Sequence, residues 1–367
     1  MRIAFVHFPG RIARLEAARA GEAPTEFLFG AVELERAGHH VVHHEVDPAR
    51  VSGLVTRRAI DLQAGAGRLP PHLSATVLAQ TRLLLPALRR ADVVVATTTG
   101  TAVALAVWRK LGRLRRPLVG IVAGLVNRPW SRARRTTTLP LLRAMDAVLY
   151  GDGELARTLA LHPSLAGRVH VDRFGVDTGW WTPETSSVTG EGVLAIGNDG
   201  NRDWSTMLAA APSIAAPLRI FTKHDPPERL PDNVTWHAAD WHLALLSDSD
   251  VRRLYRDAAV VVVPVRDVPQ PSGQSVTLQA MACGRPVVLT ETRGLWAPAS
   301  LRDGENVAFV PPADPAALAS AVSRLLADPE LARSLGGAAR AHVVADGGIE
   351  GYANRLLAIC DLASRRS

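Results

Sequence analysis

Residues 259–290 decide the fold: AVVVVPVRDVPQPSGQSVTLQAMACGRPVVLT. An uninterrupted apolar run ends at Val265, and a loop rich in Pro and Gly separates it from a helix that is expected to begin near Ser275. The helix should end at Gly284, and Pro286 opens a second apolar run. Continuous apolar strands on either side of a helix are typical of a parallel sheet that is covered on both faces.

The same alternation of strands and helices extends in both directions along the chain. After a connection at residues 169–183 it restarts with a new first strand, which predicts two doubly wound α/β domains. We expect an N-terminal domain at 1–175, a second domain at 176–345 and a C-terminal helix at 346–367 that packs back toward the first domain. Because ligands of such folds bind at the carboxyl ends of the strands, the expected site is the cleft between the domains. The predicted strands are 2–8, 41–46, 92–96, 118–122, 147–150, 192–196, 218–222, 234–237, 260–265, 286–290 and 307–310. Among the predicted helices, one begins at Pro24-Thr25-Glu26 and ends at Gly38, and another spans 315–327.

The turn before the predicted helix can bind an anion. The backbone N–H groups of Gly273, Gln274 and Ser275 should lie at the helix N-terminus, where unpaired donors meet the positive end of the helix dipole. The alternative is an ordinary turn from strand to helix, with Ser275 as a simple N-cap. The sequence of this segment leaves both interpretations open.

Length and composition exclude several classes of protein. The chain has 367 residues, 47% of them hydrophobic, which is enough for two cores and argues against intrinsic disorder. Its longest apolar stretch, residues 118–126, is far shorter than a membrane-spanning helix, and two cysteines cannot form a disulfide scaffold, so a cytoplasmic protein is expected. No Gly-Lys-Ser/Thr motif is present, which argues against a P-loop phosphotransferase.

The second half of the chain resembles a known family. The pieces LQAMACGRPVVLT (278–290) and RDGENVAFVPPADPAALASAVSRLLADPELARSLGGAARAHV (302–343), in this order, resemble the retaining GT-B glycosyltransferases of family 4. Gly175-Val176-Asp177 is similar to that family's entry into its second domain. The resemblance implies a GT-B fold with two Rossmann-like domains, and a glycosyltransferase that retains the anomeric configuration. It also implies a nucleotide-diphosphate sugar as donor, with a UDP-sugar expected, and neither a cofactor nor a metal.

Three polar groups that the family usually carries are replaced. Its two glutamates, which are separated by seven intervening residues, fall on Pro271 and Gln279, and a histidine of its first domain falls on Ala123. The resemblance assigns the ribose hydroxyls to the second of these glutamates, and Gln279 can still donate and accept hydrogen bonds there. The replacements keep open a second hypothesis, a GT-B pseudoenzyme that binds the nucleotide sugar without transferring it.

The remaining site residues follow from the same register. The family's diphosphate-binding cations fall in GNDGNRDW (197–204), where Arg202 is the only cation; the alternative is that Arg202 pairs with Asp199 or Asp203 on the surface. Trp241 can stack on the base or pack in the core. The residues expected at the diphosphate and sugar are Arg202, Ser272, Gly273, Gln274, Ser275 and Thr277.

A rival function comes from Gly151-x-Gly153-x-x-Ala156, which follows a strand and resembles a dinucleotide-binding fingerprint, with Asp172 at the ribose position. This motif predicts an NAD-dependent oxidoreductase. Asp152 and Glu154 argue against it, because they would bring two negative charges to the pyrophosphate.

The net charge of +7 is concentrated in one part of the chain. Residues 93–145 contain ten basic and no acidic residues, so this segment carries more positive charge than the whole chain. One hypothesis is that the basic stretch 108–135 forms a face for an anionic lipid or for an anionic or lipid-linked acceptor. The alternative is a solvated face whose arginines cover apolar surface. No nucleic-acid partner is expected.

Overall fold

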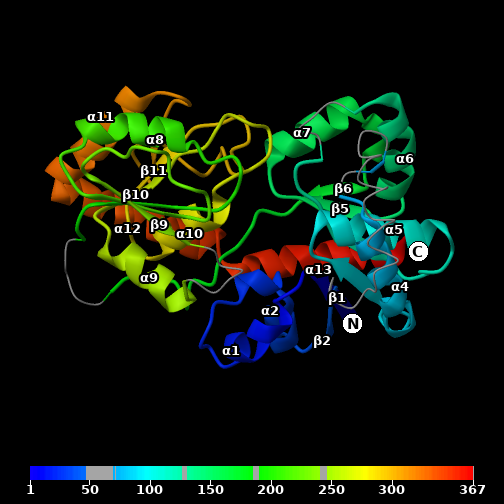
Figure 1. Ribbon diagram of the computed structural model, residues 1–367. Helices are drawn as coiled ribbons and strands as arrows, with labels where there is room; N and C mark the ends of the chain where they lie inside the picture. The colour runs from blue at the N-terminus through cyan, green and yellow to red at the C-terminus, as the bar shows by residue number, and fades with distance from the viewer. Residues whose placement is uncertain (47–68, 71, 126–129, 185–189, 240–245, 367) are drawn as a thin grey trace. The chain divides into compact units, whose positions relative to one another are not determined.

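The computed structural model describes residues 1–46, 69–70, 72–125, 130–184, 190–239 and 246–366. The chain divides into two compact units, shown in Figure 1. Unit 1 consists of Met1–Arg173 and Glu350–Ser367, and unit 2 of Phe174–Ile349. The chain therefore passes from one unit to the other between residues 173 and 174 and again between 349 and 350. The sequence analysis predicted these boundaries at 175/176 and 345/346. Within the described residues, no helix is both long enough and apolar enough to cross a membrane.

Unit 1 is built on one parallel six-stranded sheet with the strand order β2-β1-β3-β4-β5-β6. Its central strands are short runs of Val, Leu, Ile and Ala whose side chains are buried on both faces, which is why they show no polar alternation. The strands are β1 (Arg2–His7), β2 (His40–Glu45), β3 (Val93–Ala96), β4 (Leu118–Ile121), β5 (Asp146–Leu149) and β6 (Val169–Val171). The helices are α1 (Leu15–Arg19), α2 (Ala31–Arg36), α4 (Ala75–Leu88), α5 (Thr99–Lys110), α6 (Arg132–Leu142), α7 (Asp152–Leu161) and α13 (Ile349–Arg365).

Two parts of unit 1 differ from the sequence-based expectation. Residues 169–171, interpreted as connection, form the edge strand β6, which pairs with β5. The single helix expected after Pro24 is interrupted at Phe29 and Gly30, which have φ of 56° and 76°. The reason is tertiary: a Cβ on Gly30 would lie 2.9 Å from the Cβ of Ala353, on α13. The close approach of α13 therefore selects a glycine and a helix break at this point.

Unit 2 contains a second parallel six-stranded sheet with the order β12-β11-β10-β7-β8-β9. Chain order reverses between β7 and β10, which pair through Val193 and Val260, so this is the topological switch point of the sheet. The strands are β7 (Val193–Ile196), β8 (Leu218–Thr222), β9 (Val234–Ala238), β10 (Val260–Val263), β11 (Val287–Thr290) and β12 (Ala308–Val310). The helices are α8 (Trp204–Ala210), α9 (Asp248–Asp257), α10 (Gln274–Ala282), α11 (Pro315–Ala327) and α12 (Pro329–Asp346).

The strand β10 is shorter than expected, and the residues after it build the site. Pro264 has no backbone N–H, and ladder pairing stops before it. Its carbonyl instead accepts a bond from the backbone N–H of Asp203, and Val265 forms an isolated bridge with Arg202. The loops that follow β7 and β10 are thus hydrogen-bonded to each other at the switch point.

Candidate functional site

The candidate site of unit 2 lies at the carboxyl edge of its sheet, between the loop after β7 and the start of α10. In parallel α/β sheets, ligands bind outside the carboxyl ends of the strands at the switch point. Helix α10 has Gly273 as its N-cap, so the N-cap residue itself provides no side-chain bond to the positive end of this helix. The anion site expected at this turn therefore has the required backbone geometry.

Arg202 is buried at this edge. Only 3% of its side chain is exposed, and its Nε lies 3.3 Å from Asp199 Oδ2 without hydrogen-bond geometry. Within the described part of the chain, Nε and Nη1 make no hydrogen bond. Burial lowers the pKa of the guanidinium, and the nearby Asp199 opposes this effect, but an arginine stays charged in proteins. A buried, underpaired cation is costly unless an anion completes its coordination.

Two glycines make room for this guanidinium. A Cβ on Gly197 would lie 2.0 Å from Arg202 Nε, and a Cβ on Gly273 would lie 2.8 Å from Arg202 Nη1. The backbones on both sides of the guanidinium can approach it closely only because neither position carries a side chain. The same Gly273 has a φ of 78°, which lets the chain turn into α10.

Asp203 does not pair with Arg202. Its carboxylate caps α8, accepting bonds from the hydroxyls of Ser205 and Thr206 at 2.6 and 2.7 Å and from the backbone N–H of Thr206 at 3.2 Å. Burial raises the pKa of Asp203, but these hydrogen bonds outweigh it, and the net shift is downward. Of the two partners considered for Arg202, only Asp199 forms an ion pair with it. The Asp199 side chain is 39% exposed, but the Arg202 side chain is only 3% exposed, so the guanidinium is buried and not on the surface.

The other expected donor-site residues lie at different depths. Ser272 accepts a bond from Asn201 Nδ2 at 2.8 Å, which ties the two loops together, and Ser275 is half-buried. Gln274 is 8% exposed and Thr277 is fully buried, with no hydrogen bond to its hydroxyl within the described residues. Gln279 is 4% exposed, and its Oε1 accepts a bond from the Tyr255 hydroxyl at 3.2 Å. Trp241 lies outside the described residues.

Two cations at this edge were missed by the sequence analysis, which regarded Arg202 as nearly alone. Lys223 directly follows β8, and Arg266 lies three residues after β10; both are exposed. The backbone N–H of Arg266 donates to the Asn201 carbonyl at 2.8 Å, next to Arg202. The sequence could have indicated both residues, because each follows a predicted strand and the carboxyl ends of parallel strands meet at one edge of the sheet.

The contacts of the GDGELA loop argue against a dinucleotide site there. Glu154, at the start of α7, is fully buried, and its Oε1 accepts the Gly124 N–H at 2.6 Å. Asp152 pairs with Arg173 at 3.0 Å. Asp172, at the position expected to bind ribose, is fully buried and pairs with Arg355 Nε at 2.8 Å. The three carboxylates of the proposed fingerprint therefore serve contacts within unit 1.

Glu154 predicts a pH dependence of stability. Burial raises the pKa of its carboxyl to about 7, although the amides of Gly124 and Leu125 act in the opposite direction. The folded state then binds a proton that the unfolded state has lost, so stability should fall as the pH rises from the unfolded pKa near 4.5 toward 7. Above about pH 7, we expect Glu154→Gln to raise the free energy of unfolding by on the order of 3 kcal/mol, because the buried charge is removed. Urea denaturation over this pH range should show curves that diverge between wild type and variant; parallel curves would contradict the assignment.

In a comparison with known proteins, the model of the family of glycosyl transferases group 1 matches residues 192–328. The chain is 30% identical over 232 residues to an alpha-maltose-1-phosphate synthase of Mycolicibacterium smegmatis. That alignment spans 54% of this chain and 58% of the relative, so the chain covers little more than half of this curated relative. The segment that the family model matches, residues 192–328, contains Arg202.

Solved structures resemble the whole chain. A sucrose-phosphate synthase from Thermosynechococcus elongatus aligns over 100% of both chains with a TM-score of 0.71 at 18% identity. HepE from Anabaena, solved in complex with UDP and glucose, aligns over 98% of both chains with a TM-score of 0.65 at 16% identity. These similarities establish the fold: two six-stranded parallel sheets with flanking helices, the GT-B architecture.

Proposed function

We propose that this GT-B chain is a glycosyltransferase that uses a nucleotide-diphosphate sugar, with a UDP-sugar as donor, and transfers the sugar with retention to an acceptor that we do not assign. One observation carries the proposal: a buried Arg202 whose Nε and Nη1 make no hydrogen bond to the described residues, enclosed by Gly197 and Gly273 beside the start of α10, where the N-cap glycine makes no side-chain bond. A diphosphate is the anion that suits this arrangement, since it accepts from a guanidinium and from a helix N-terminus at the same time. The UDP bound to HepE supports the choice of base.

We assign the roles as follows. Arg202 binds the diphosphate, assisted by the backbone at Gly273, Gln274 and Ser275, and Ser272 holds the adjoining loop through Asn201. Lys223 and Arg266 add positive potential at the same edge. Gln279 keeps donor and acceptor capacity for the ribose hydroxyls beside its bond from Tyr255. Thr277 is fully buried in α10, and we assign it a structural role in that helix.

The chemistry requires stabilisation of the leaving diphosphate. As the bond between the sugar C1 and the phosphate oxygen breaks, negative charge grows on the diphosphate, next to Arg202 and the positive end of α10. Pro271 supplies no carboxylate, so a double displacement through a glutamate at this position is not available. We therefore propose attack by the acceptor hydroxyl from the same face, with its proton passing to the leaving phosphate oxygen.

A ligand screen tests this function against its alternatives. We expect UDP-sugars to raise the melting temperature more than GDP- or dTDP-sugars, and to be turned over in the presence of a suitable acceptor. Stabilisation by UDP-sugars without transfer or hydrolysis, over a broad acceptor panel, would favour the pseudoenzyme. Stabilisation by NAD(H) alone would reject the transferase.

A further inference from the structure

The amino edge of the first sheet, opposite to the edge where ligands of this fold bind, carries a dense group of cations. Helices α4 and α5 both run toward this edge and end there, and the turn from α5 to β4 follows. We call the exposed cations of this region the basic edge: Arg82, Arg89, Arg90, Lys110, Arg113, Arg115 and Arg116. Three of them, Arg82, Arg89 and Arg90, lie outside the basic stretch identified in the sequence.

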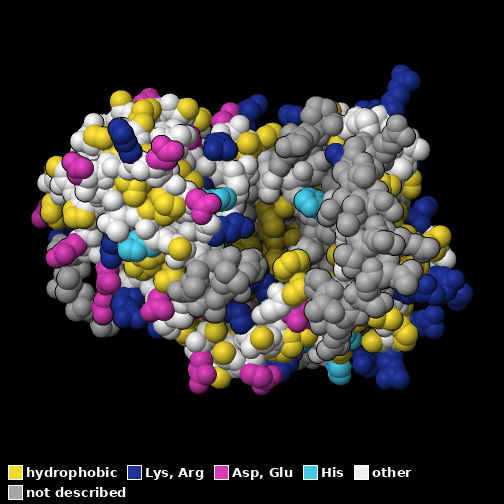
Figure 2. All heavy atoms as spheres, viewed as in Figure 1, with side chains coloured by type: hydrophobic (Ala, Val, Ile, Leu, Met, Phe, Trp, Pro, Cys, Tyr) yellow, Lys and Arg dark blue, Asp and Glu magenta, His cyan; other side chains and the backbone are white. Residues whose placement is uncertain are grey.

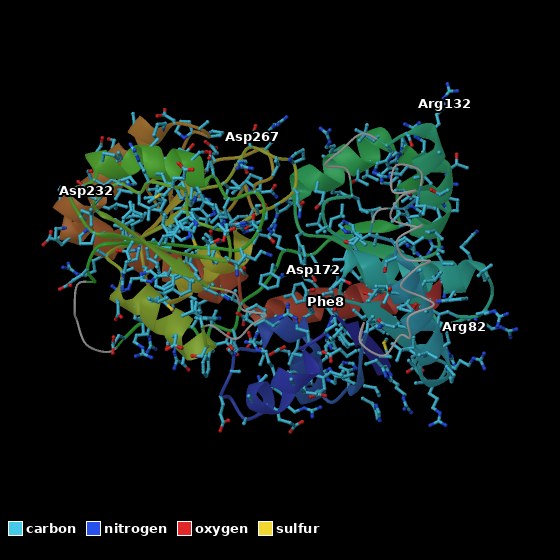
Figure 3. The ribbon with its side chains drawn as sticks, in the orientation of Figure 1. Phe8, Arg82, Arg132, Asp172, Asp232 and Asp267 are labelled. Atoms are coloured by element: carbon cyan, nitrogen blue, oxygen red, sulfur yellow. The ribbon has the colours of Figure 1, made fainter. Side chains whose placement is uncertain are left out.

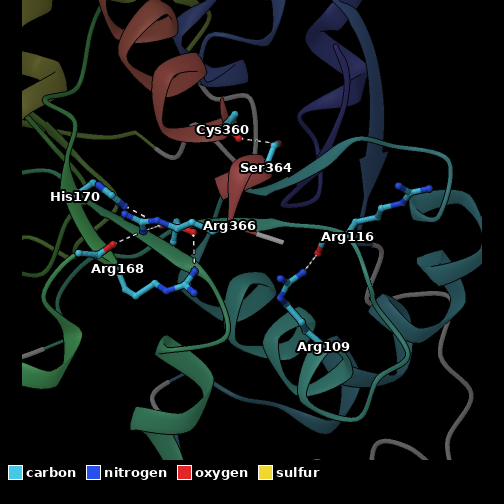
Figure 4. Close-up of polar contacts among 9 residues, drawn as sticks. Arg109, Arg116, Arg168, His170, Cys360, Ser364 and Arg366 are labelled. Atoms are coloured by element: carbon cyan, nitrogen blue, oxygen red, sulfur yellow. Dashed lines mark hydrogen bonds and ion pairs between the residues drawn. The ribbon is translucent and has the colours of Figure 1, made fainter. Parts of the chain in front are cut away.

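A surface hollow of about 640 Å³ lies within the basic edge. It is lined by Arg89, Gly112, Arg113, Arg115 and Arg116. Arg116 is fixed in place, since its Nε and Nη2 donate to the Arg89 carbonyl at 3.0 and 2.8 Å. Arg109 in turn donates to the Arg116 carbonyl (Figure 4). Four arginines therefore surround one concave surface. Its shape is held by the hydrogen bonds from Arg116 to the Arg89 carbonyl and from Arg109 to the Arg116 carbonyl.

The nearby carboxylates are already engaged. Asp92 accepts the backbone N–H of Arg2 at 2.7 Å. Asp146 is 2% exposed and accepts from Arg168, His170 and Arg366 at 3.2, 3.0 and 2.9 Å (Figure 4). The carbonyls at the ends of α4 and α5 favour cations. The hydrogen bonds described above use one such carbonyl, that of Arg89, which accepts from Arg116, whereas Arg109 donates to the Arg116 carbonyl in the turn before β4. Among the described residues, the side chains of Arg89, Arg113 and Arg115 have no ion pair or hydrogen bond.

Exposed apolar side chains accompany these cations. Leu83 is 70% exposed and Leu111 is 62% exposed, the two highest values for large hydrophobic side chains in the described part of the chain. Leu83 adjoins Arg82 on α4, and Leu111 adjoins Lys110 at the end of α5. Figure 2 shows Lys and Arg side chains beside hydrophobic ones at the lower right, where α4 lies in Figure 1. Cations mixed with exposed leucines are typical of surfaces that bind the interface of an anionic bilayer.

The structure also corrects the idea that residues 108–135 form one face. Strand β4 (Leu118–Ile121) crosses the sheet in the middle of this stretch. Residues up to Arg116 therefore lie at the amino edge, whereas Arg132 and Arg135 at the start of α6 lie at the carboxyl edge. Figure 3 shows the separation, with Arg82 on α4 and Arg132 on α6 far apart in unit 1. Arg128 lies outside the described residues.

We propose that the basic edge, together with Leu83 and Leu111, docks unit 1 on an anionic phospholipid surface. The hollow receives a phosphate headgroup through Arg89, Arg113 and Arg115, and the two leucines enter the interfacial layer. A bilayer fits both features, because it offers phosphates and apolar chains at the same surface. This docking is independent of the proposed transferase activity.

Sedimentation of the full chain with vesicles tests the proposal. We expect binding to mixed phosphatidylcholine and phosphatidylglycerol vesicles at low salt, weaker binding at high salt, and none to phosphatidylcholine alone. Replacing Arg89, Arg113 and Arg115 with glutamine should lower the partition coefficient by roughly a hundredfold, since each cation near an anionic bilayer contributes about a factor of five. Leu83→Asn with Leu111→Asn should weaken binding at both salt concentrations.

The controls match charge and polarity. Arg229, Arg324 and Arg333 are exposed arginines of unit 2. Replacing all three with glutamine gives a variant with the same net charge as the Arg89/Arg113/Arg115 variant. Val344→Asn, at a position that is 53% exposed, is the control for the leucine substitutions. Both control variants should bind vesicles as the wild type does. Equal losses in the two arginine triples would reject the proposal, as would absence of binding at low salt. Tight, saturable binding of glycerol phosphate that the Arg89/Arg113/Arg115 variant loses, without vesicle binding, would reassign the hollow to a soluble phosphate ligand.

Discussion

Arg202→Met is expected to abolish tight binding of UDP while making the ligand-free protein more stable. Arg202 is buried, and two of its donor nitrogens make no hydrogen bond to the residues that the structure describes. Its burial therefore carries a desolvation cost that a bound anion would offset. Methionine fills a similar volume without charge, and Asp199, whose side chain is 39% exposed, can be hydrated once the guanidinium is gone. We expect the free energy of unfolding to rise by about 1–2 kcal/mol. We expect the dissociation constant for UDP to rise about a hundredfold, the equivalent of two charge-assisted hydrogen bonds.

The two measurements separate a ligand-binding role from a structural one. Urea denaturation without nucleotide gives the stability, and isothermal titration calorimetry with UDP gives the affinity. Arg324→Met, at an exposed arginine of α11, serves as the control and should change neither quantity. Loss of stability with unchanged UDP affinity would mean that Arg202 only supports the two loops.

Gly273→Ala should be strongly destabilising and should also impair UDP binding. Its φ of 78° disfavours any residue with a Cβ, and the added Cβ would lie 2.7 Å from Val263 Cγ1 and 2.8 Å from Arg202 Nη1. The left-handed conformation costs about 1 kcal/mol for alanine, and the overlaps add about 1–3 kcal/mol. Relief of the overlaps would move either β10 or the guanidinium, so the anion site should be distorted as well.

Gly304 supplies a matched control for this substitution. It has a φ of 72°, and a Cβ placed there would meet nothing within 4 Å. Gly304→Ala therefore incurs the conformational cost alone, about 1 kcal/mol, and should bind UDP normally. Comparison of the two variants by urea denaturation isolates the cost of contact at Gly273. Equal destabilisation would show that the surroundings of Gly273 adjust without strain.

Much of the fold could be predicted because the signals are local. The strand at 218–222 and the helix at 315–327 coincide with the predicted ranges. A short run with Leu, Ile, Phe and Thr, and an apolar periodicity that begins at a Pro, are both properties of consecutive residues. The break at Phe29 and Gly30 could not be predicted in this way. Its cause is Ala353, which approaches Gly30 from a helix more than three hundred positions away in the sequence.

The candidate site was predictable in its backbone and not in its charge environment. The Pro- and Gly-rich loop before α10 indicated an uncapped helix N-terminus at a strand end, and the structure has one at Gly273. That Arg202 is buried with unused donors depends on Gly197 and Gly273, which lie on separate loops and meet only at the switch point. Lys223 and Arg266 join this edge for the same topological reason.

The sequence by itself determined the order of strands and helices and the two-sheet α/β class, because hydrophobic periodicity and helix-stop residues act over a few neighbouring positions. Only the tertiary structure decided which charges are buried and which are displayed. In the folded chain, Arg202 is buried between two loops. The two halves of one basic stretch lie at opposite edges of a sheet, and Arg82, Arg89 and Arg90 lie with the half at the amino edge. The energy of a charge depends on its solvent exposure and on neighbours distant in the chain, and these exist only once the chain has folded.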